Sequence, residues 1–134
     1  MKKPFSLSKQ ERLKSQKDID TLFQSGKAFF IFPYRVCYHL SSSKETAAPL
    51  QFGISVPKRN FKRSVDRNLI KRLSRETYRV QKNELLSMLT TRRQSLKMMW
   101  IYMHKEKLSH AELYPSVSLI LQRLNEILTE QPLT

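Results

Sequence analysis

Residues that could act in acid–base or metal chemistry are few in this chain and are widely spaced. Asp18 and Asp20 lie two positions apart on a predicted helix, where their carboxylates would not face each other and could not share a metal ion. His39, His104 and His110 lack the spacing of metal ligands. The sequence therefore predicts no catalytic residue, no metal site and no bound cofactor in the protein itself.

Cationic side chains are the residues whose spacing does indicate chemistry. Between positions 58 and 82 there are ten basic residues and two acidic ones, Asp66 and Glu76. Five basic residues recur at every fourth position: Arg63, Arg67, Lys71, Arg75 and Arg79. A helix face that only needs solvation usually alternates its charges, because like charges four positions apart are unfavourable. The pattern therefore indicates an external polyanion along one helix face.

The other side of this helix carries an apolar set that predicts packing against a core: Val65, Leu69, Leu73 and Val80. This set contains no aromatic residue, whereas a helix on a membrane surface usually presents bulky and aromatic side chains. Arginine also outnumbers lysine within the helix, and its planar guanidinium suits phosphate better than a diffuse lipid surface. Nucleic acid is therefore favoured over an anionic membrane.

The composition agrees with a nucleic-acid partner. The 134 residues include 25 Lys and Arg against 11 Asp and Glu, a formal charge of +14. Residues 1–82 hold 19 of the basic residues and 6 of the acidic ones, so the binding surface is expected in the first two thirds of the chain. The chain has only two glycines, which excludes a glycine-rich phosphate loop.

The remaining composition points to a single cytoplasmic domain. Cys37 is the only cysteine and lies in an apolar run, so it is expected to be a buried thiol without a disulfide partner. No apolar stretch approaches the roughly 20 residues of a membrane span, and no secretory signal follows the first lysines. We expect one nucleic-acid-binding domain over residues 1–134, with residues 1–11 as a flexible basic tail.

The first half of the chain predicts a helix and then strands. Ile19, Leu22 and Phe23 have helical spacing, and Gly26 follows as a helix stop. The next run is rich in Phe, Ile, Val and Tyr but is interrupted by Pro33, which suits an edge, a bulge or a strand start. The predicted segments are helix 18–24, one or two pieces of strand within 28–40, hairpin loop 41–49 and strand 50–56.

The second half predicts the basic helix, a central strand and a final helix. Ser64 is a plausible N-cap, and the helix is expected to run to about Lys82. The segment 97–104 is apolar on both faces, which is typical of a central strand. A helical stripe of leucine, isoleucine and valine over 117–128 predicts the last helix, with Pro115 close to its first turn.

Two stretches resemble the protein subunit of bacterial ribonuclease P. The first is Phe-Gly-Ile-Ser-Val-Pro-Lys-Arg-Asn at 52–60, and the second contains Arg-Asn-Leu-Ile-Lys-Arg at 67–72 followed by Arg75 and Glu76. Upstream, Arg12-Leu13 and the segment from Lys17 to Gly26 are similar to that family's N-terminal helix. The resemblance covers roughly residues 12–128.

The resemblance implies a fold and a role. The fold would be a compact α+β domain with a four-stranded sheet, about three helices and a left-handed β-α-β crossover. The partners would be the catalytic RNA subunit of ribonuclease P and precursor tRNA, with no membrane or DNA partner. Hydrolysis that generates the mature tRNA 5′ end would take place at Mg²⁺ held by the RNA subunit, so the enzyme is an endoribonuclease whose protein subunit contributes no catalytic residue.

Site residues follow from the same resemblance. Contacts with the RNA subunit are expected at Arg67, Asn68, Lys71, Arg72 and Arg75, supported by Lys58, Arg59, Lys62 and Arg63. A cleft between the first helix and the sheet would hold the 5′ leader of precursor tRNA, and the matching positions are Ile19, Phe23 and Tyr38. Leu69 and Ile19 depart from the family pattern, which usually has Arg and often has Phe at these positions.

Two other functions remain open from the residues alone. A structural RNA-binding protein of the ribosomal type would use the same basic helix but would need no aromatic cleft for a single strand. A DNA-binding protein would insert the helix into a major groove and contact base edges, whereas A-form RNA offers mainly phosphates and exposed loops.

Overall fold

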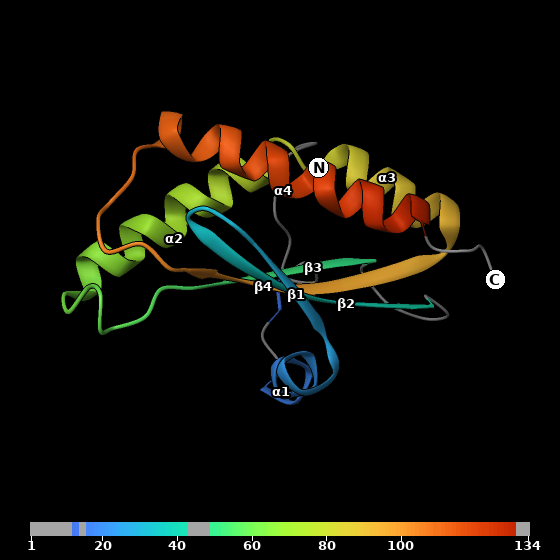
Figure 1. The fold of residues 1–134 in the computed structure, drawn as a ribbon, viewed down its shortest axis with the longest axis horizontal. Helices are drawn as coiled ribbons and strands as arrows, with labels where there is room; N and C mark the ends of the chain where they lie inside the picture. The colour runs from blue at the N-terminus through green and yellow to red at the C-terminus, as the bar shows by residue number, and fades with distance from the viewer. Residues whose placement is uncertain (1–11, 14–15, 43–48, 131–134) are drawn as a thin grey trace, which may run out of the picture.

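The computed structural model describes residues 12–13, 16–42 and 49–130, which form a mixed α/β arrangement (Figure 1). The tail expected over residues 1–11 lies outside the described residues. The elements are α1 (Gln16–Ser25), β1 (Lys27–Ile31), β2 (Tyr34–Ser42), β3 (Leu50–Ser55), α2 (Ser64–Arg79), α3 (Asn83–Arg92), β4 (Gln94–Tyr102) and α4 (His110–Glu130). The α+β fold class and the four-stranded sheet predicted above are confirmed.

The four strands lie in the order β1-β2-β4-β3. β4 pairs with β2 on one side and with β3 on the other, so the central position expected for this apolar strand is confirmed. The hairpin predicted over 41–49 is wrong, because β4 separates β2 from β3. A polar loop indicates only that the chain turns, whereas which strands become neighbours depends on the packing of the whole sheet.

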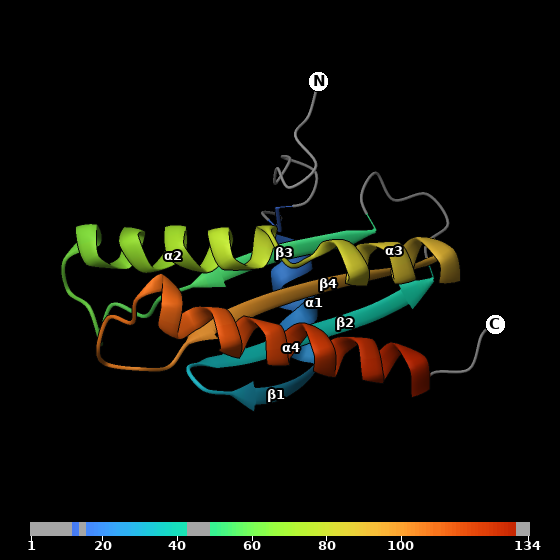
Figure 2. The same cartoon turned by 90° about the horizontal axis from the view of Figure 1, so that it is seen from above.

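β3 and β4 are parallel and are joined through α2 and α3. Figure 2 looks onto the sheet from the side of these helices; both strands run from right to left, and β4 lies below β3. When the strands are turned to point upward with the helices in front, the chain passes leftward from β3 to β4. The crossover is therefore left-handed, as the resemblance implied, although such connections are usually right-handed.

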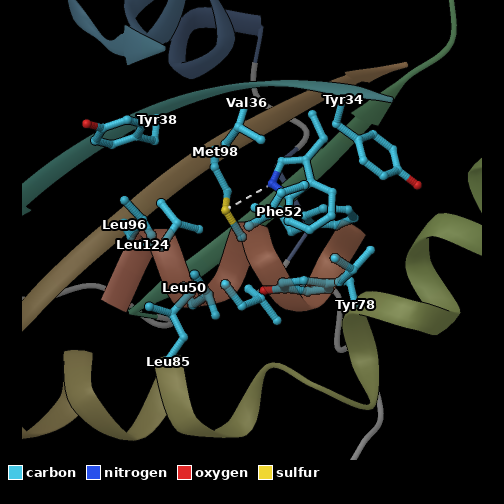
Figure 3. Close-up of a cluster of buried hydrophobic side chains, with 14 of the residues drawn as sticks. Tyr34, Val36, Tyr38, Leu50, Phe52, Tyr78, Leu85, Leu96, Met98 and Leu124 are labelled. Atoms are coloured by element: carbon cyan, nitrogen blue, oxygen red, sulfur yellow. Dashed lines mark hydrogen bonds between the residues drawn. The ribbon is translucent and has the colours of Figure 1, made fainter. Parts of the chain in front are cut away.

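The sheet has helices on both faces: α2, α3 and α4 cover one face, and α1 crosses the other (Figure 1). The main core lies under the three helices and centres on Trp100, whose Nε1 donates to the Met98 sulfur at 3.2 Å (Figure 3). The Phe52 and Tyr78 rings stack with centroids 4.1 Å apart and join β3 to α2. A smaller cluster around Leu22, Cys37 and Met99 fills the α1 face.

The side through which the basic helix α2 packs was predicted only in part: Leu73 packs against the main core as expected, and Leu69 is half-buried. Its buried residues are Ile70, Ser74, Thr77 and Tyr78, whereas Val65 and Val80 are exposed. Two of the buried residues are polar, but their hydroxyls are satisfied within the core: Ser74 Oγ lies 2.6 Å from the Tyr34 hydroxyl, and Thr77 donates to the Leu73 and Ser74 carbonyls. Hydrophobicity therefore identified Leu73 but missed the buried polar residues of the packed side.

The limits of α2 also differ from the prediction. Arg63, with extended backbone, is the N-cap, so Ser64 is the first helical residue and not the cap. The helix ends at Arg79, and a separate helix, α3, begins at Asn83. The chain thus has four helices in its described part instead of about three, because the basic periodicity continues past the point where the backbone turns.

The helix α4 begins seven residues before the stripe that predicted it. Ser109 and Glu112 form a capping box, in which Ser109 Oγ accepts from the Glu112 amide at 3.2 Å and Glu112 Oε1 accepts from the Ser109 amide at 3.1 Å. Pro115 consequently lies inside the helix rather than near its start. The Pro33 and Gly26 predictions are confirmed, since Pro33 lies in the turn between β1 and β2 and α1 ends at Ser25.

Candidate nucleic-acid interface

The helix α1 is fixed on its face of the sheet by the apolar residues that predicted it. Leu22 is buried against Cys37 of β2 and Met99 of β4, with Ile19 packed beside them. Burial raises the pKa of the Cys37 thiol, partly opposed by the nearby Arg35 guanidinium. Cys37 is therefore the buried thiol that the sequence predicted.

Two residues before α1 attach the chain to the free edge of β3. The Leu13 amide donates to the Phe52 carbonyl at 2.9 Å, and Arg12 forms an isolated parallel β-bridge with Phe52. This contact fixes the backbone of Arg12 beside the sheet while its side chain remains exposed. The side chain of an arginine far from α2 in sequence is thereby brought to the same edge of the sheet as α2.

A cleft of about 400 Å³ lies at this edge, between α1, β3 and α2. Its apolar wall includes Ile19, Ile54 and Met99, and its cationic rim consists of Arg12 and Arg75. Gly53 leaves space at the floor of the cleft, where a Cβ would lie 2.6 Å from the Met99 methyl carbon. The cleft can therefore hold a ligand with an apolar part and an anionic part.

The electrostatics of the rim favour an anion. Partial burial lowers the pKa of the Arg75 guanidinium, and the neighbouring Arg12 guanidinium lowers it further. An arginine nevertheless remains charged at neutral pH. Two like charges held near each other repel, so an anion that binds between them relieves this repulsion as well as forming its own ion pairs.

The basic loop and the start of α2 form the rest of the cationic surface. Lys58, Arg59, Lys62 and Arg63 are all exposed in the loop, and Asn68, Arg72 and Arg75 are exposed on the helix, with Lys71 half-buried between them. Successive members of a four-residue repeat rotate about 40° around a helix, so the row winds from the loop toward the cleft. All nine residues predicted to contact RNA therefore lie, exposed or half-buried, in the loop and along α2.

Arg67 has a structural role that the sequence did not indicate. Its Nη1 donates to the Phe61 carbonyl at 2.8 Å and to the Lys62 carbonyl at 2.9 Å, which holds the basic loop against the helix. Asp66, the acid of the first turn, pairs with Lys107 at 3.2 Å. One of the two carboxylates of α2 is therefore bound to a lysine from another part of the chain.

The three residues predicted for the aromatic cleft are not brought together. Ile19 lines the cleft, and Phe23 lies one turn further along α1 with 52% of its surface exposed. Tyr38, only 9% exposed, is in the core on the other face of the sheet, as Figure 3 shows. The placement of Tyr38 in this cleft was therefore wrong: side chains alternate along β2, and Cys37 is the residue that faces α1.

Arg12 is the residue of the cleft that the sequence did not identify as part of a site. Together with Leu13 it indicated only a similarity to a family's N-terminal helix. The available signal was its place just before the predicted helix, in a segment that an open sheet edge could pair with. Only the strand order, with β3 at the edge, shows that Arg12 meets Arg75.

Comparison with known proteins agrees with this geometry. The family model described as Ribonuclease P matches residues 7–125. The chain belongs to the ribonuclease P family. A ribonuclease P protein component of Porphyromonas gingivalis is 47% identical over 88 residues, which are 66% of this chain and 64% of that protein. Another, of Chlorobium phaeobacteroides, is 28% identical over 125 residues, covering 92% and 86% of the two chains.

Solved ribonuclease P proteins share the fold. The Staphylococcus aureus protein gives a TM-score of 0.66 at 21% identity, covering 84% of this chain and 94% of that chain. The Thermotoga maritima protein gives 0.63 at 21% identity, covering 84% and 96%. The strand order and the left-handed crossover described above therefore stand in a fold already seen in the ribonuclease P family.

Metal sites and membrane spans are not found among the described residues. Within residues 12–13, 16–42 and 49–130, no three His, Cys, Asp or Glu side chains come together in a group that could hold a metal ion. Across the same part of the chain, no helix combines the length and the apolar character needed to cross a bilayer.

Proposed function

We propose that this chain is the protein subunit of ribonuclease P, which binds the catalytic RNA subunit and the 5′ leader of precursor tRNA. The observation that carries the proposal is the set of cationic residues that extends from the basic loop along α2 to Arg12 and Arg75 at the apolar cleft. Family membership supports the same assignment.

The proposed role of the cationic surface is to neutralise phosphates. Lys58, Arg59, Lys62 and Arg63 would contact the RNA backbone from the loop, and Asn68, Lys71 and Arg72 would do so from α2. Each neutralised phosphate releases counterions, so that binding falls steeply with salt. Hydrolysis would belong to the RNA subunit and its magnesium ions, in line with the dispersed carboxylates of this chain.

The proposed role of the α1 face is to bind a single strand. Ile19 offers an apolar wall, and the exposed Phe23 offers an aromatic surface on which any base can stack. Arg75 and Arg12 would hold a phosphate where the strand crosses the rim of the cleft. Mature tRNA has no leader, so this surface would distinguish precursor from product.

Reconstitution tests the proposal. Purified protein, transcribed RNA subunit and precursor tRNA are combined at low Mg²⁺, and cleavage is followed with and without the protein. We expect faster cleavage with the protein, tighter binding of precursor than of mature tRNA, and no cleavage by the protein alone. Cleavage by RNA-free protein would contradict the proposal. Equal affinity for precursor and mature tRNA would instead favour a structural RNA-binding protein.

A further inference from the structure

A row of side chains crosses the α1 face of the sheet next to α1. Phe30 of β1 is paired with Arg35 of β2, and Arg35 is paired with Ile101 of β4. Phe29 and Ile31 pack into the core on the other face, so the alternation along β1 places Phe30 on the α1 face. The row therefore presents an aromatic ring, a guanidinium and an aliphatic side chain in adjacent strands.

The helix α1 directs Phe23 toward this row. Asp18 pairs with Lys97 of β4 at 3.2 Å, and Lys97 lies on the opposite side of Met99 from Ile101. Side chains five positions apart on a helix point about 140° apart. Asp18 and Phe23 therefore lie on opposite sides of the buried face of α1. Because Asp18 faces Lys97, Phe23 faces the Ile101 end of the sheet.

The aromatic ring and the guanidinium of this row are exposed, although the fold does not require an aromatic ring or a cation at these positions. Phe30 is 57% exposed on an edge strand, and Arg35 is exposed beside it. Within the described part of the chain, no carboxylate lies within ion-pair distance of Arg35. The net charge of +14 favours a polyanion over a protein partner, and a ring with an adjacent guanidinium matches a base and its phosphate.

We propose that Phe30 and Arg35 form a second nucleotide subsite on the α1 face, in which a leader base stacks on Phe30 and Arg35 binds the adjoining phosphate. The subsite rests on the proposed function and extends it, since Phe23 and Phe30 would take different nucleotides of one single strand. The leader would cross the sheet from the Arg12 and Arg75 rim toward β1.

The test uses the reconstituted holoenzyme and precursor tRNAs that carry the fluorescent base 2-aminopurine at successive leader positions. Stacking on an aromatic ring quenches this fluorophore. We expect Phe30→Ala to relieve quenching at one leader position and Phe23→Ala at another, with quenching retained in Phe30→Trp. Loss of one base–aromatic stack should weaken precursor binding by roughly 5- to 150-fold and leave mature tRNA unaffected.

Two controls keep the outcomes separate. Leu119→Ala removes a similarly exposed apolar side chain from α4, on the other face of the sheet. It should change neither the fluorescence of the leader bases nor the affinity for precursor tRNA. Arg35→Ala should weaken precursor binding and reduce its salt dependence, whereas Arg35→Lys should retain part of both. Melting temperatures of all variants should stay close to that of the parent, because these side chains are exposed.

The subsite is overturned if Phe30→Ala binds every precursor like the parent protein while Phe23→Ala does not. It is also overturned if Phe30→Ala changes the oligomeric state and not leader binding, since the row would then be a protein interface. If the parent protein itself fails to distinguish precursor from mature tRNA, the proposed function has failed, and the subsite fails with it.

Discussion

At the scale of single residues, the cations of the basic row differ in role: most are free to contact RNA, whereas one holds the basic loop in place. Arg67 belongs to the basic row, yet its guanidinium holds two carbonyls of the preceding loop. Within the described residues, Lys71 and Arg72 have no such bond; Arg72 is exposed and Lys71 is half-buried. Substitution of Arg67 would therefore alter the loop and the charge together, whereas Lys71 and Arg72 report on charge.

Phe23 provides the sharpest test at this scale. Phe23→Ala should cost about 1–3 kcal/mol of precursor affinity in the holoenzyme, the usual range for a base that stacks on an aromatic ring. Because half of its surface is exposed, the melting temperature should hardly change. Equal losses for precursor and mature tRNA, with a large fall in melting temperature, would show instead that Phe23 supports the fold.

Tyr102 predicts how stability depends on alkaline pH. Its hydroxyl donates to the Glu106 carbonyl at 2.7 Å and accepts from the Leu108 amide at 3.2 Å, and burial raises its pKa to about 12. The pKa in the unfolded chain is about 10, so the neutral form stabilises the fold below pH 10 and this contribution is lost as the pH rises through 12.

Denaturant unfolding at successive pH values measures this effect. The free energy of unfolding of the parent protein should fall by roughly 2–3 kcal/mol more between pH 9 and 12 than that of Tyr102→Phe. The variant should be less stable at pH 8, because it loses both hydrogen bonds. If the free energies of unfolding of the two proteins decrease equally with pH, folding does not raise the pKa of Tyr102.

At the scale of elements, α4 shows how a local signal sets the length of a helix. The capping box of Ser109 and Glu112 satisfies amides of the first turn, and the helix then continues through Pro115. Proline is costly inside a helix because it lacks an amide hydrogen. The cap and the buried leucines beyond Pro115 offset this cost, so that the helix continues to Glu130.

Removal of the cap should therefore be measurable. Ser109→Ala should lower the free energy of unfolding by about 0.5–2 kcal/mol, as is usual for N-cap serines. Ser109→Asp, which keeps an acceptor at the N-cap, should retain most of the stability. Both values come from denaturant titration. An unchanged free energy for Ser109→Ala would indicate that α4 begins beyond Pro115 in solution.

At the scale of the whole molecule, charge is concentrated on one part of the fold. The basic loop, α2 and the Arg12 edge carry the cationic residues, whereas α3 and α4 mix both signs, as in the pair of Arg123 with Glu126 at 3.8 Å. A one-sided field orients the protein as it approaches a polyanion. It also predicts that the affinity for RNA depends on which cations are removed and not only on how many.

Salt dependence measures this directly. Lys71→Ala combined with Arg72→Ala should reduce the slope of log K against log salt for the RNA subunit by roughly 0.7–0.9 for each phosphate that is no longer neutralised. Arg92→Ala combined with Arg123→Ala removes the same charge from α3 and α4 and should leave the slope nearly unchanged. The melting temperatures should agree. An equal decrease of the slope in both double variants would refute a localised interface.

Much of the fold and of the cationic surface follows from the sequence, because both depend on local patterns. Helical spacing of Ile19, Leu22 and Phe23 located α1, apolar runs located the strands, and the repeat of basic residues located α2 and its cationic side. These signals arise within a few residues of chain, where periodicity reports the environment of each side. The sequence did not predict α3 as a separate helix, because basic residues continue past the end of α2.

Tertiary structure decided which residues meet. Tyr38 belongs to the core and Cys37 to the α1 face because the register of β2 against β4 sets the direction of every side chain along the strand. Arg12 meets Arg75 because β3 is an edge strand, and Phe30 lies beside Arg35 because β1 and β2 pair in one register. These relations join residues far apart in sequence, and only the packing of the whole sheet determines them.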